Sequence, residues 1–190
     1  MVVVLPGFLT EPVGECTHFR ERGIRMISFV RVDDRMIHGQ TVTSWSLEYP
    51  CDGIIAVNDA AATNPVLKAA YKGAAPEKKI FVWTMEHFLA KAQKVLDSDS
   101  KYFLITKNPI DMKKILVDHK FVPSDVKRVI IGPCNDRPGA VKLGNNQSIT
   151  QEEAQALEDI TKAGYTVEFA LIKEKSIGEW PKFRDQFDVK

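Results

Sequence analysis

The chain has 190 residues, a length typical of one domain, and 44% of them are hydrophobic, which is enough for a sizeable core. Its 26 basic and 25 acidic residues nearly balance, which argues against a nucleic-acid-binding protein, because such proteins usually carry a basic surplus. Three widely spaced cysteines fit neither a disulfide framework nor a zinc site, and no apolar run is long enough to span a membrane, so we expect a protein of the cytoplasm.

Residues 1–25 differ in character from the rest of the chain. Their apolar run is short, is broken by Pro6 and Gly7, and has no basic residue before it, so a secretory signal is not expected. The segment has no clear period and ends in a cluster of charges. We interpret it as an N-terminal extension, from an upstream start or from added residues, and we expect one domain at residues 26–190.

Apolar, β-branched runs recur along that domain and predict strands. They lie at residues 26–32, 53–58, 79–84, 101–106, 126–132 and 165–172. The first is followed, from His38, by helical spacing that puts Val42, Trp45 and Tyr49 on one face. The glycine- and asparagine-rich stretch at residues 132–147 holds at most a short hairpin.

The other intervening segments carry signals for helix ends. Asn followed by Pro predicts an N-cap and a first helical residue, once at residues 64–65 and again at residues 108–109. A further helix is predicted over residues 85–96 from its apolar stripe. Thr150 and Glu153 have the spacing of a capping box, and Gly164 stands where the last helix should end.

Strands that alternate with helices predict an α/β fold, with a mostly parallel central sheet and helices on both faces. Such sheets bind ligands outside the carboxyl ends of their strands. The turn from Asp33 to His38 leaves the first strand at that edge and opens a helix, so the chemistry of the protein is expected there.

The residues of this turn suit phosphoryl transfer through histidine. His38 is a nucleophile near neutral pH. Arg35 offers a guanidinium fork for phosphate oxygens, and Gly39 lets the backbone approach an anion at a helix start. Either Asp33 or Asp34 could hold the second imidazole nitrogen. Each member also has an ordinary interpretation, since aspartates cap turns and a lone histidine after a strand is often structural.

Other candidates have less support. His87 and His119 stand near helix ends, where a structural role is the better interpretation. There is no glycine-rich nucleotide motif. Adjacent acids such as Asp33 and Asp34 point in different directions and have no evident third partner, so we expect neither a metal nor a cofactor. Asn58 and Asp59 should reach the same sheet edge as His38 and are interpreted as turn formers.

The stretch VRVDDRMIHGQTVTSW, residues 30–45, resembles the signature of the IIB component of the mannose/fructose/sorbose family of the bacterial sugar phosphotransferase system. That family typically reads R-[IV]-D-[DE]-R-[LI]-I-H-G-Q-V, with a tryptophan a little downstream. Further similarity lies at residues 54–76, 104–116 and 149–172. The likeness covers about Met26 to Phe187.

The resemblance implies a cytoplasmic sugar phosphotransferase that works at the membrane permease. His38 would take a phosphoryl group from a histidine of the IIA component and give it to a sugar delivered by the membrane components IIC and IID. Arg35 matches the arginine expected to steady the phosphate, and Asp33 a supporting acid. Asp34, Gly39 and Gln40 also match the motif; from chemistry we assign Asp34 to imidazole orientation and the other two to phosphate binding.

Some features depart from the family pattern or are left open. Residues 130–144 differ, since Pro133 to Asp136 replace the usual residues. The motif suits mannose, sorbose, fructose and N-acetylgalactosamine systems alike, and it does not decide whether the chain forms a homodimer. Two alternatives to transport are a sensor domain phosphorylated on His38 that passes no phosphate to sugar, and a metal-free phosphatase.

Overall fold

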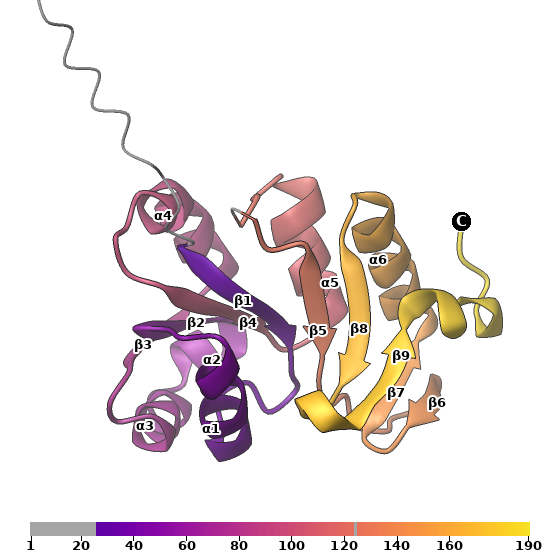
Figure 1. Cartoon of the computed structure of the whole chain (residues 1–190), viewed down its shortest axis with the longest axis horizontal. Helices are drawn as coiled ribbons and strands as arrows, with labels where there is room; N and C mark the ends of the chain where they lie inside the picture. Colours follow the sequence, from indigo (N-terminus) through magenta and orange to yellow (C-terminus); the bar gives the residue numbers. More distant parts are fainter. Residues whose placement is uncertain (1–25, 124) are drawn as a thin grey trace, which may run out of the picture.

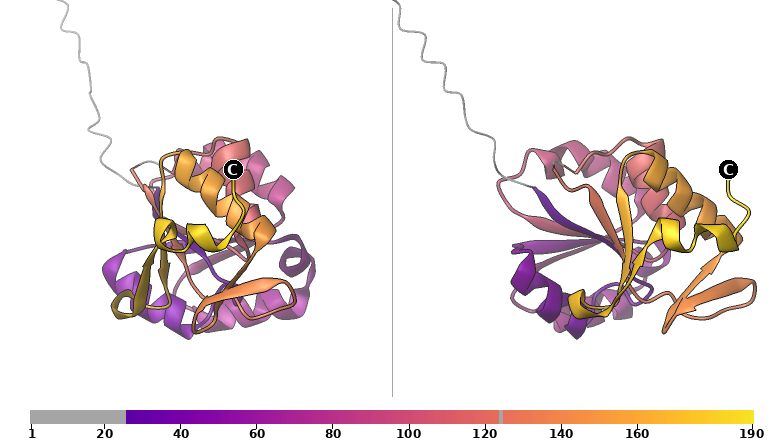
Figure 2. Two further views of the ribbon diagram at one scale, coloured as in Figure 1. Left: turned by 90° about the vertical axis from the view of Figure 1, so that its right-hand side faces the viewer. Right: turned by 45° about the vertical axis from the view of Figure 1, so that its right-hand side comes forward.

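A seven-stranded sheet between two layers of helices forms the centre of the molecule (Figures 1 and 2). The computed structural model describes residues 26–123 and 125–190, so the predicted extension at residues 1–25 lies outside the described residues and stays a prediction. The strand order is β3-β2-β4-β1-β5-β8-β9, and every neighbouring pair is parallel except β8 with β9. The predicted α/β fold class is confirmed.

The strands of the sheet are β1 (Ile27–Val32), β2 (Gly53–Val57), β3 (Lys79–Trp83), β4 (Tyr102–Thr106), β5 (Arg128–Ile131), β8 (Thr166–Ala170) and β9 (Ser176–Glu179). The helices are α1 (Gly39–Glu48), α2 (Asp59–Thr63), α3 (Pro65–Ala74), α4 (Met85–Leu96), α5 (Pro109–Lys113) and α6 (Gln151–Lys162). A π-helical turn (Lys114–Asp118) continues α5, and three 3₁₀ turns lie at Lys173–Lys175, Trp180–Lys182 and Arg184–Gln186. The predicted short hairpin is present as β6 (Ala140–Gly144) and β7 (Gln147–Thr150).

Helices α1, α2 and α3 lie on one face of the sheet, and α4, α5 and α6 lie on the other (Figures 1 and 2). Two buried clusters fill the spaces between the layers. One contains Phe88 and Leu157 from the α4 to α6 layer, and the other contains Trp45 and Ala61 from the α1 to α3 layer. Because both faces of the sheet are covered, its central strands are mainly apolar, as the sequence pattern predicts.

The helix-end signals act as predicted. The Asn64 side chain accepts hydrogen bonds from the Val66 and Leu67 N–H groups at 3.0 and 3.2 Å and caps α3. Thr150 and Glu153 form the capping box of α6. Each satisfies N–H groups that a helix start leaves without a partner inside the helix.

Two elements of the described chain go beyond the sequence prediction. Helix α2 is capped by Asn58, which accepts from the Ala61 N–H at 3.0 Å, and Asp59 accepts from the Met85 N–H at 2.8 Å. Strand β9 runs antiparallel to β8 and includes Gly178, whose φ of +123° is strained for other residues. Its sequence SIGE has no β-branched alternation, so only the pairing with β8 makes it a strand.

The C-terminal segment is fastened to α6 by a buried carboxylate. Glu158 accepts a hydrogen bond from Trp180 Nε1 and another from Arg184 Nε, both at 2.9 Å. Trp180 is fully buried and Glu158 is 5% exposed. Burial alone would raise the pKa of Glu158, but the hydrogen bonds from Trp180 and Arg184 outweigh it and hold that pKa below its ordinary value.

Replacing Glu158 by glutamine should lower the free energy of unfolding at pH 7 by about 1–3 kcal/mol, the range for a hydrogen bond to a charged group. A lowered folded-state pKa stabilises the fold above the unfolded-state value of about 4.3, and this contribution is lost as the pH falls through the folded-state pKa. The stability difference between the two chains should therefore shrink below about pH 4. Urea denaturation across pH 3–7 measures this difference in the free energy of unfolding, and Glu152→Gln, at an exposed position, is the matched control. A difference that persists at pH 3 would contradict the assigned role of the Glu158 carboxylate.

The topology singles out one position on the sheet. Strands β1 and β5 are neighbours, yet the chain leaves β1 for β2 on one side and leaves β5, by way of α6, for β8 on the other. Ligands of open α/β sheets bind where the connections diverge in this way, outside the carboxyl ends of the strands. The turn after β1 lies there. No helix within residues 26–123 and 125–190 is long and apolar enough to cross a membrane.

Candidate active site

His38 is the N-cap residue of α1, just past the carboxyl end of β1. Asp33 holds the turn between them: its Oδ1 accepts from the Arg35 N–H at 3.0 Å, and its carbonyl oxygen accepts from the Met36 N–H at 2.9 Å. Met36 has a left-handed backbone with φ of 55°, and its side chain is fully buried. This conformation costs about 1–2 kcal/mol in an ordinary residue, and burial of the methionine offsets that strain, so the core fixes the turn that presents His38.

The Asp33 carboxylate is the centre of the site. It is fully buried, and its Oδ2 accepts from Arg31 Nε at 3.0 Å and lies 3.1 Å from His38 Nε2. The His38 side chain is 12% exposed, so the ring stands at the boundary between the core and solvent. A carboxylate in this position fixes the orientation of the ring and favours the tautomer that carries its proton on Nε2.

Arg31 lies beneath this pair and has no part in the sequence prediction. Its guanidinium is 1% exposed and also donates to the carbonyl oxygens of Ala170 and Leu171, at 3.1 and 3.2 Å. It lies 5.3 Å from the centroid of the Trp45 ring, within range of a cation–π interaction. Burial lowers the pKa of Arg31, and the charge of Asp33 acts in the opposite direction. The buried cation and the buried carboxylate therefore compensate each other.

A glycine makes the space for Arg31. A Cβ on Gly132, just beyond β5, would stand 2.2 Å from Arg31 Nη2 and 2.5 Å from its Cζ. The signal that could have revealed Arg31 is its position, because it is a charged residue inside an apolar strand, two residues before Asp33. Residues at i and i+2 of a strand share a face, so the two side chains can meet.

Asp34 contacts a different part of the chain from Asp33. Its Oδ2 accepts from the Asn135 N–H at 2.9 Å, and its own N–H donates to the Pro133 carbonyl oxygen at 2.9 Å. Its Oδ1 is buried and has no hydrogen-bond partner among the described residues. Of the two aspartates considered for orienting the imidazole, Asp33 is thus the one with this contact, and Asp34 connects the turn to the loop at residues 133–135.

The remaining predicted residues differ in their surroundings. The Arg35 side chain is exposed and makes no hydrogen bond or ion pair within the described ranges. Gly39 is exposed at the first position of α1, and a Cβ there would meet nothing within 4 Å. The side chain of Gln40 lies outside the described residues.

A hollow of 430 Å³ adjoins the turn at the same edge of the sheet. It is lined by Asp34, Lys107, Asn108, Ile110, Cys134, Asn135, Asp136, Arg137 and Glu153. Burial raises the pKa of Cys134 far above its ordinary value, so its thiol is not a nucleophile at neutral pH. Arg137 is held by Glu153. No group of three or more His, Cys, Asp or Glu side chains in the described ranges is arranged to hold a metal ion.

The fold and the site together define an α/β protein with a carboxylate-oriented histidine at the carboxyl edge of its sheet. Comparison with known families gives a match over residues 27–189 to the family described as "PTS system sorbose subfamily IIB component". The chain belongs to this family, the IIB components of the sugar phosphotransferase system of the mannose and sorbose type, and is a sugar phosphotransferase. The predicted family is confirmed.

Individual relatives agree with this result. The chain is 27% identical over 147 residues to the sorbose-specific EIIB component of Klebsiella pneumoniae, covering 77% of this chain and 87% of that protein. It is 26% identical over 149 residues to the mannose-specific EIIAB component of Escherichia coli K12, covering 75% of this chain and 43% of that longer protein. The crystal structure of the IIB domain of the Klebsiella pneumoniae sorbose permease superposes with a TM-score of 0.71 at 27% identity, over 80% of this chain and 92% of that one.

Proposed function

We propose that His38 carries the phosphoryl group in this protein: it accepts the group from a phosphohistidine of a IIA component and passes it to a sugar that enters through the IIC and IID membrane components. The observation that supports this most is the 3.1 Å contact between His38 Nε2 and the buried Asp33 carboxylate, at the carboxyl edge of the sheet. An imidazole held through Nε2–H has its nucleophilic lone pair on Nδ1, so Nδ1 is the acceptor atom.

The transfer to His38 is a displacement at phosphorus, and the proposed step uses no metal ion. Nδ1 attacks the phosphorus in line, a new bond forms between Nδ1 and phosphorus, and the bond from phosphorus to the donor imidazole breaks with its electron pair returning to that ring. His38 gains positive charge as the bond forms, and its proton stays on Nε2 beside Asp33. The carboxylate lies within hydrogen-bond distance of that nitrogen and stabilises the developing charge.

Arg31 tunes this carboxylate. A buried carboxylate is tolerated only where it has partners, and Arg31 is the cation that compensates Asp33. The bond from Arg31 Nε to Asp33 Oδ2 divides that negative charge between two donors. Arg31 therefore fixes the carboxylate oxygen that orients the ring.

The phosphate oxygens are assigned to the exposed residues of the turn. Arg35 offers its guanidinium fork, and the N–H groups at the start of α1, including those of Gly39 and Gln40, favour an anion. Asp34 holds the loop at residues 133–135 against the turn and so shapes the surface around the phosphate. In the transfer to the sugar, a sugar hydroxyl attacks the phosphorus, and the bond between phosphorus and Nδ1 breaks with its electron pair returning to the imidazole. The hydroxyl proton passes to a base, which need not belong to this chain.

The partners follow from the family. A IIA component is the donor. The Escherichia coli mannose relative is named an EIIAB component, a name that combines IIA and IIB. The IIC and IID components bring the sugar, and the proposed function has this protein work in the cytoplasm, peripherally associated with the permease. Since His38 meets two partners in turn, the surface around it should form transient interfaces.

Radiolabelled phosphoryl transfer tests the proposal. The chain is incubated with a phosphorylated IIA component, and then with membranes that contain the IIC and IID components and a sugar. We expect an acid-labile, base-stable adduct on His38 Nδ1, seen by NMR, and movement of the label to the sugar. Label that stays on the protein would support the sensor alternative, and rapid release of inorganic phosphate would support a phosphatase; either result overturns the carrier function.

Replacing Arg35 by lysine should slow phosphoryl acceptance about 10- to 100-fold, because an ammonium cannot make the forked contact that a guanidinium makes with phosphate oxygens. The measurement is the single-turnover rate of label transfer from phosphorylated IIA. Arg128→Lys is the matched control, since Arg128 begins β5 at the opposite edge of the sheet. Equal rates in Arg35→Lys and the unmodified chain would show that Arg35 does not hold the phosphate.

A further inference from the structure

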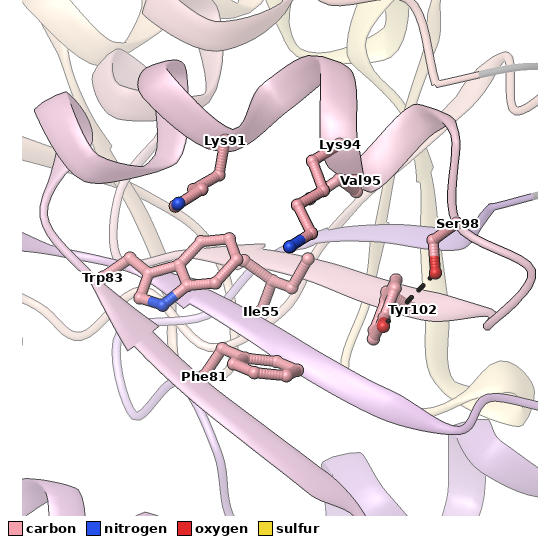
Figure 3. A pocket seen from close by; sticks show the side chains of 8 residues that line it. All are labelled: Ile55, Phe81, Trp83, Lys91, Lys94, Val95, Ser98 and Tyr102. Carbon is pink, nitrogen blue, oxygen red and sulfur yellow. Dashed lines mark hydrogen bonds between the residues drawn. The ribbon is translucent and has the colours of Figure 1, made fainter.

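A second hollow lies between α4 and strands β2, β3 and β4 (Figure 3). Its volume is 280 Å³, close to the lower end of the range for small-molecule sites, about 300–1,000 Å³. It is lined by Ile55, Phe81, Trp83, Lys91, Lys94, Val95, Ser98 and Tyr102, which come from β2, β3, α4, β4 and the α4–β4 connection. His38 and the residues that contact it take no part in it.

The floor of this hollow is aromatic because β3 is the outermost strand. Phe81 and Trp83 are two residues apart in β3, so both side chains lie on the α4 face. Because β3 has a neighbouring strand on one side only, both stay partly exposed. Their ring centroids are 5.2 Å apart, and Tyr102 meets Phe81 edge-on at 5.9 Å. This fixed group of rings offers a surface on which a flat apolar molecule can stack.

The rim of the hollow is cationic. Lys91 and Lys94 lie three residues apart on α4 and extend their ammonium groups over the aromatic floor (Figure 3). Neither makes an ion pair or a hydrogen bond within the described ranges, and no acidic residue lines the hollow. Some other lysines do have acidic partners, as Lys113 has Asp118 and Lys162 has Glu158. Two uncompensated cations above an apolar floor favour an anion with an apolar body.

The far end of the hollow has a polar group. Ser98 Oγ and the Tyr102 hydroxyl lie 3.5 Å apart, and either can donate or accept a hydrogen bond (Figure 3). A ligand that fills the hollow would therefore meet rings below it, cations at one side and hydroxyls at the other. Small-molecule sites are usually apolar cavities on which a small number of polar groups converge.

We propose that this hollow is a binding site for a small aromatic anion, a carboxylate, sulfonate or phosphate ester of up to three rings. The ring system stacks on Trp83 and Phe81, and the anionic group lies between the ammonium groups of Lys91 and Lys94. The site is separate from the phosphoryl-transfer turn, so the proposal does not depend on the chemistry of His38.

A pair of fluorescent probes tests it directly. 1-Anilinonaphthalene-8-sulfonate and N-phenyl-1-naphthylamine share one ring system and differ in the sulfonate. We expect saturable binding of the sulfonate with tryptophan-sensitised emission, and weaker binding of the uncharged probe. The double variant Lys91→Gln/Lys94→Gln should weaken sulfonate binding about tenfold, the size expected for two partly exposed ion pairs, and leave the uncharged probe unchanged.

Three further variants locate the site. Lys68→Gln/Lys72→Gln removes the same charge from α3, on the other face of the sheet, and should bind the sulfonate like the unmodified chain. Trp83→Phe should still bind the sulfonate but lose much of the sensitised emission. His38→Ala should change neither the binding nor the emission. Circular dichroism checks that each variant is folded. The proposal is overturned if the two probes bind equally, if both lysine pairs have the same effect, or if Trp83→Phe leaves the sensitised emission intact.

Discussion

Replacing His38 by alanine should abolish labelling of the protein by a phosphorylated IIA component. The substitution removes the only imidazole that the buried Asp33 contacts in the described chain, and no other nucleophile of the turn can form a phosphoramidate. The fold should survive, because Asp33 keeps its hydrogen bonds from Arg31 Nε and the Arg35 N–H. The measurement is incorporation of label over time, with thermal unfolding to confirm the folded state.

Two other histidines are natural controls for this experiment. His87 lies in the first turn of α4 with its ring 5.1 Å from that of Trp83, and His119 follows the π-helical turn after α5. Neither has the contact with a buried carboxylate that His38 has in this structure. His87→Ala and His119→Ala should therefore take up label like the unmodified chain. Label retained by His38→Ala, or lost from either control, would show that the phosphoryl group is carried elsewhere.

Replacing Gly132 by alanine should lower the free energy of unfolding by about 2–4 kcal/mol, between the cost of overpacking a core and that of breaking a buried ion pair. The new Cβ would stand 2.2 Å from Arg31 Nη2, and the guanidinium has little freedom to move away because it also donates to Ala170 and Leu171. Displacing Arg31 leaves Asp33 without its compensating cation. Phosphoryl acceptance should fall together with stability, although Gly132 does not touch His38.

Gly73→Ala is the matched control for that substitution. Gly73 lies in α3, and a Cβ there would meet nothing within 4 Å. Alanine is favoured over glycine in helices by about 0.5–1 kcal/mol, so this variant should be slightly more stable and fully active. Urea denaturation and single-turnover transfer measure both effects. If Gly132→Ala unfolds at the same urea concentration as the unmodified chain, the tight packing around Arg31 is wrong.

Gly132 and Arg31 explain how the fold and the site depend on each other. The guanidinium spans from β1 to the carbonyl oxygens at the end of β8, so it ties the central strand to the far side of the sheet. The same guanidinium fixes the carboxylate that holds His38. We therefore expect a substitution that loosens the packing at this point to lower both phosphoryl acceptance and stability.

Much of the architecture could be predicted because its signals are local. The helix that begins at Pro65 is set by the Asn64 side chain, and the start of α6 by the capping box of Thr150 and Glu153. The central strands of the parallel sheet are buried on both faces, so each is marked by a mainly apolar run. The turn from Asp33 to His38 could be placed at the carboxyl edge for the same reason, since the strand before it is one of those runs.

Other features depend on contacts between residues far apart in sequence. The sequence offers Asp33 and Asp34 as equal candidates for orienting the imidazole. In the structure Asp33 contacts Arg31, whereas Asp34 contacts Asn135. Strand β9 exists because it pairs with β8, and the tail after it is held by Glu158 and the burial of Trp180. The hollow under α4 exists because β3 is the edge strand, which follows from the strand order.

By itself, the sequence determined the α/β class, the helix ends, the family and the turn that carries His38, because these follow from hydrophobic period, capping chemistry and a contiguous motif. Only the tertiary structure decided which carboxylate meets the imidazole, that Arg31 lies buried beneath it, and where an aromatic hollow stays open. The physical reason is that a buried charge is tolerated only where it has partners. For these charges the partners come from distant parts of the chain, so they meet only when the strands pack together.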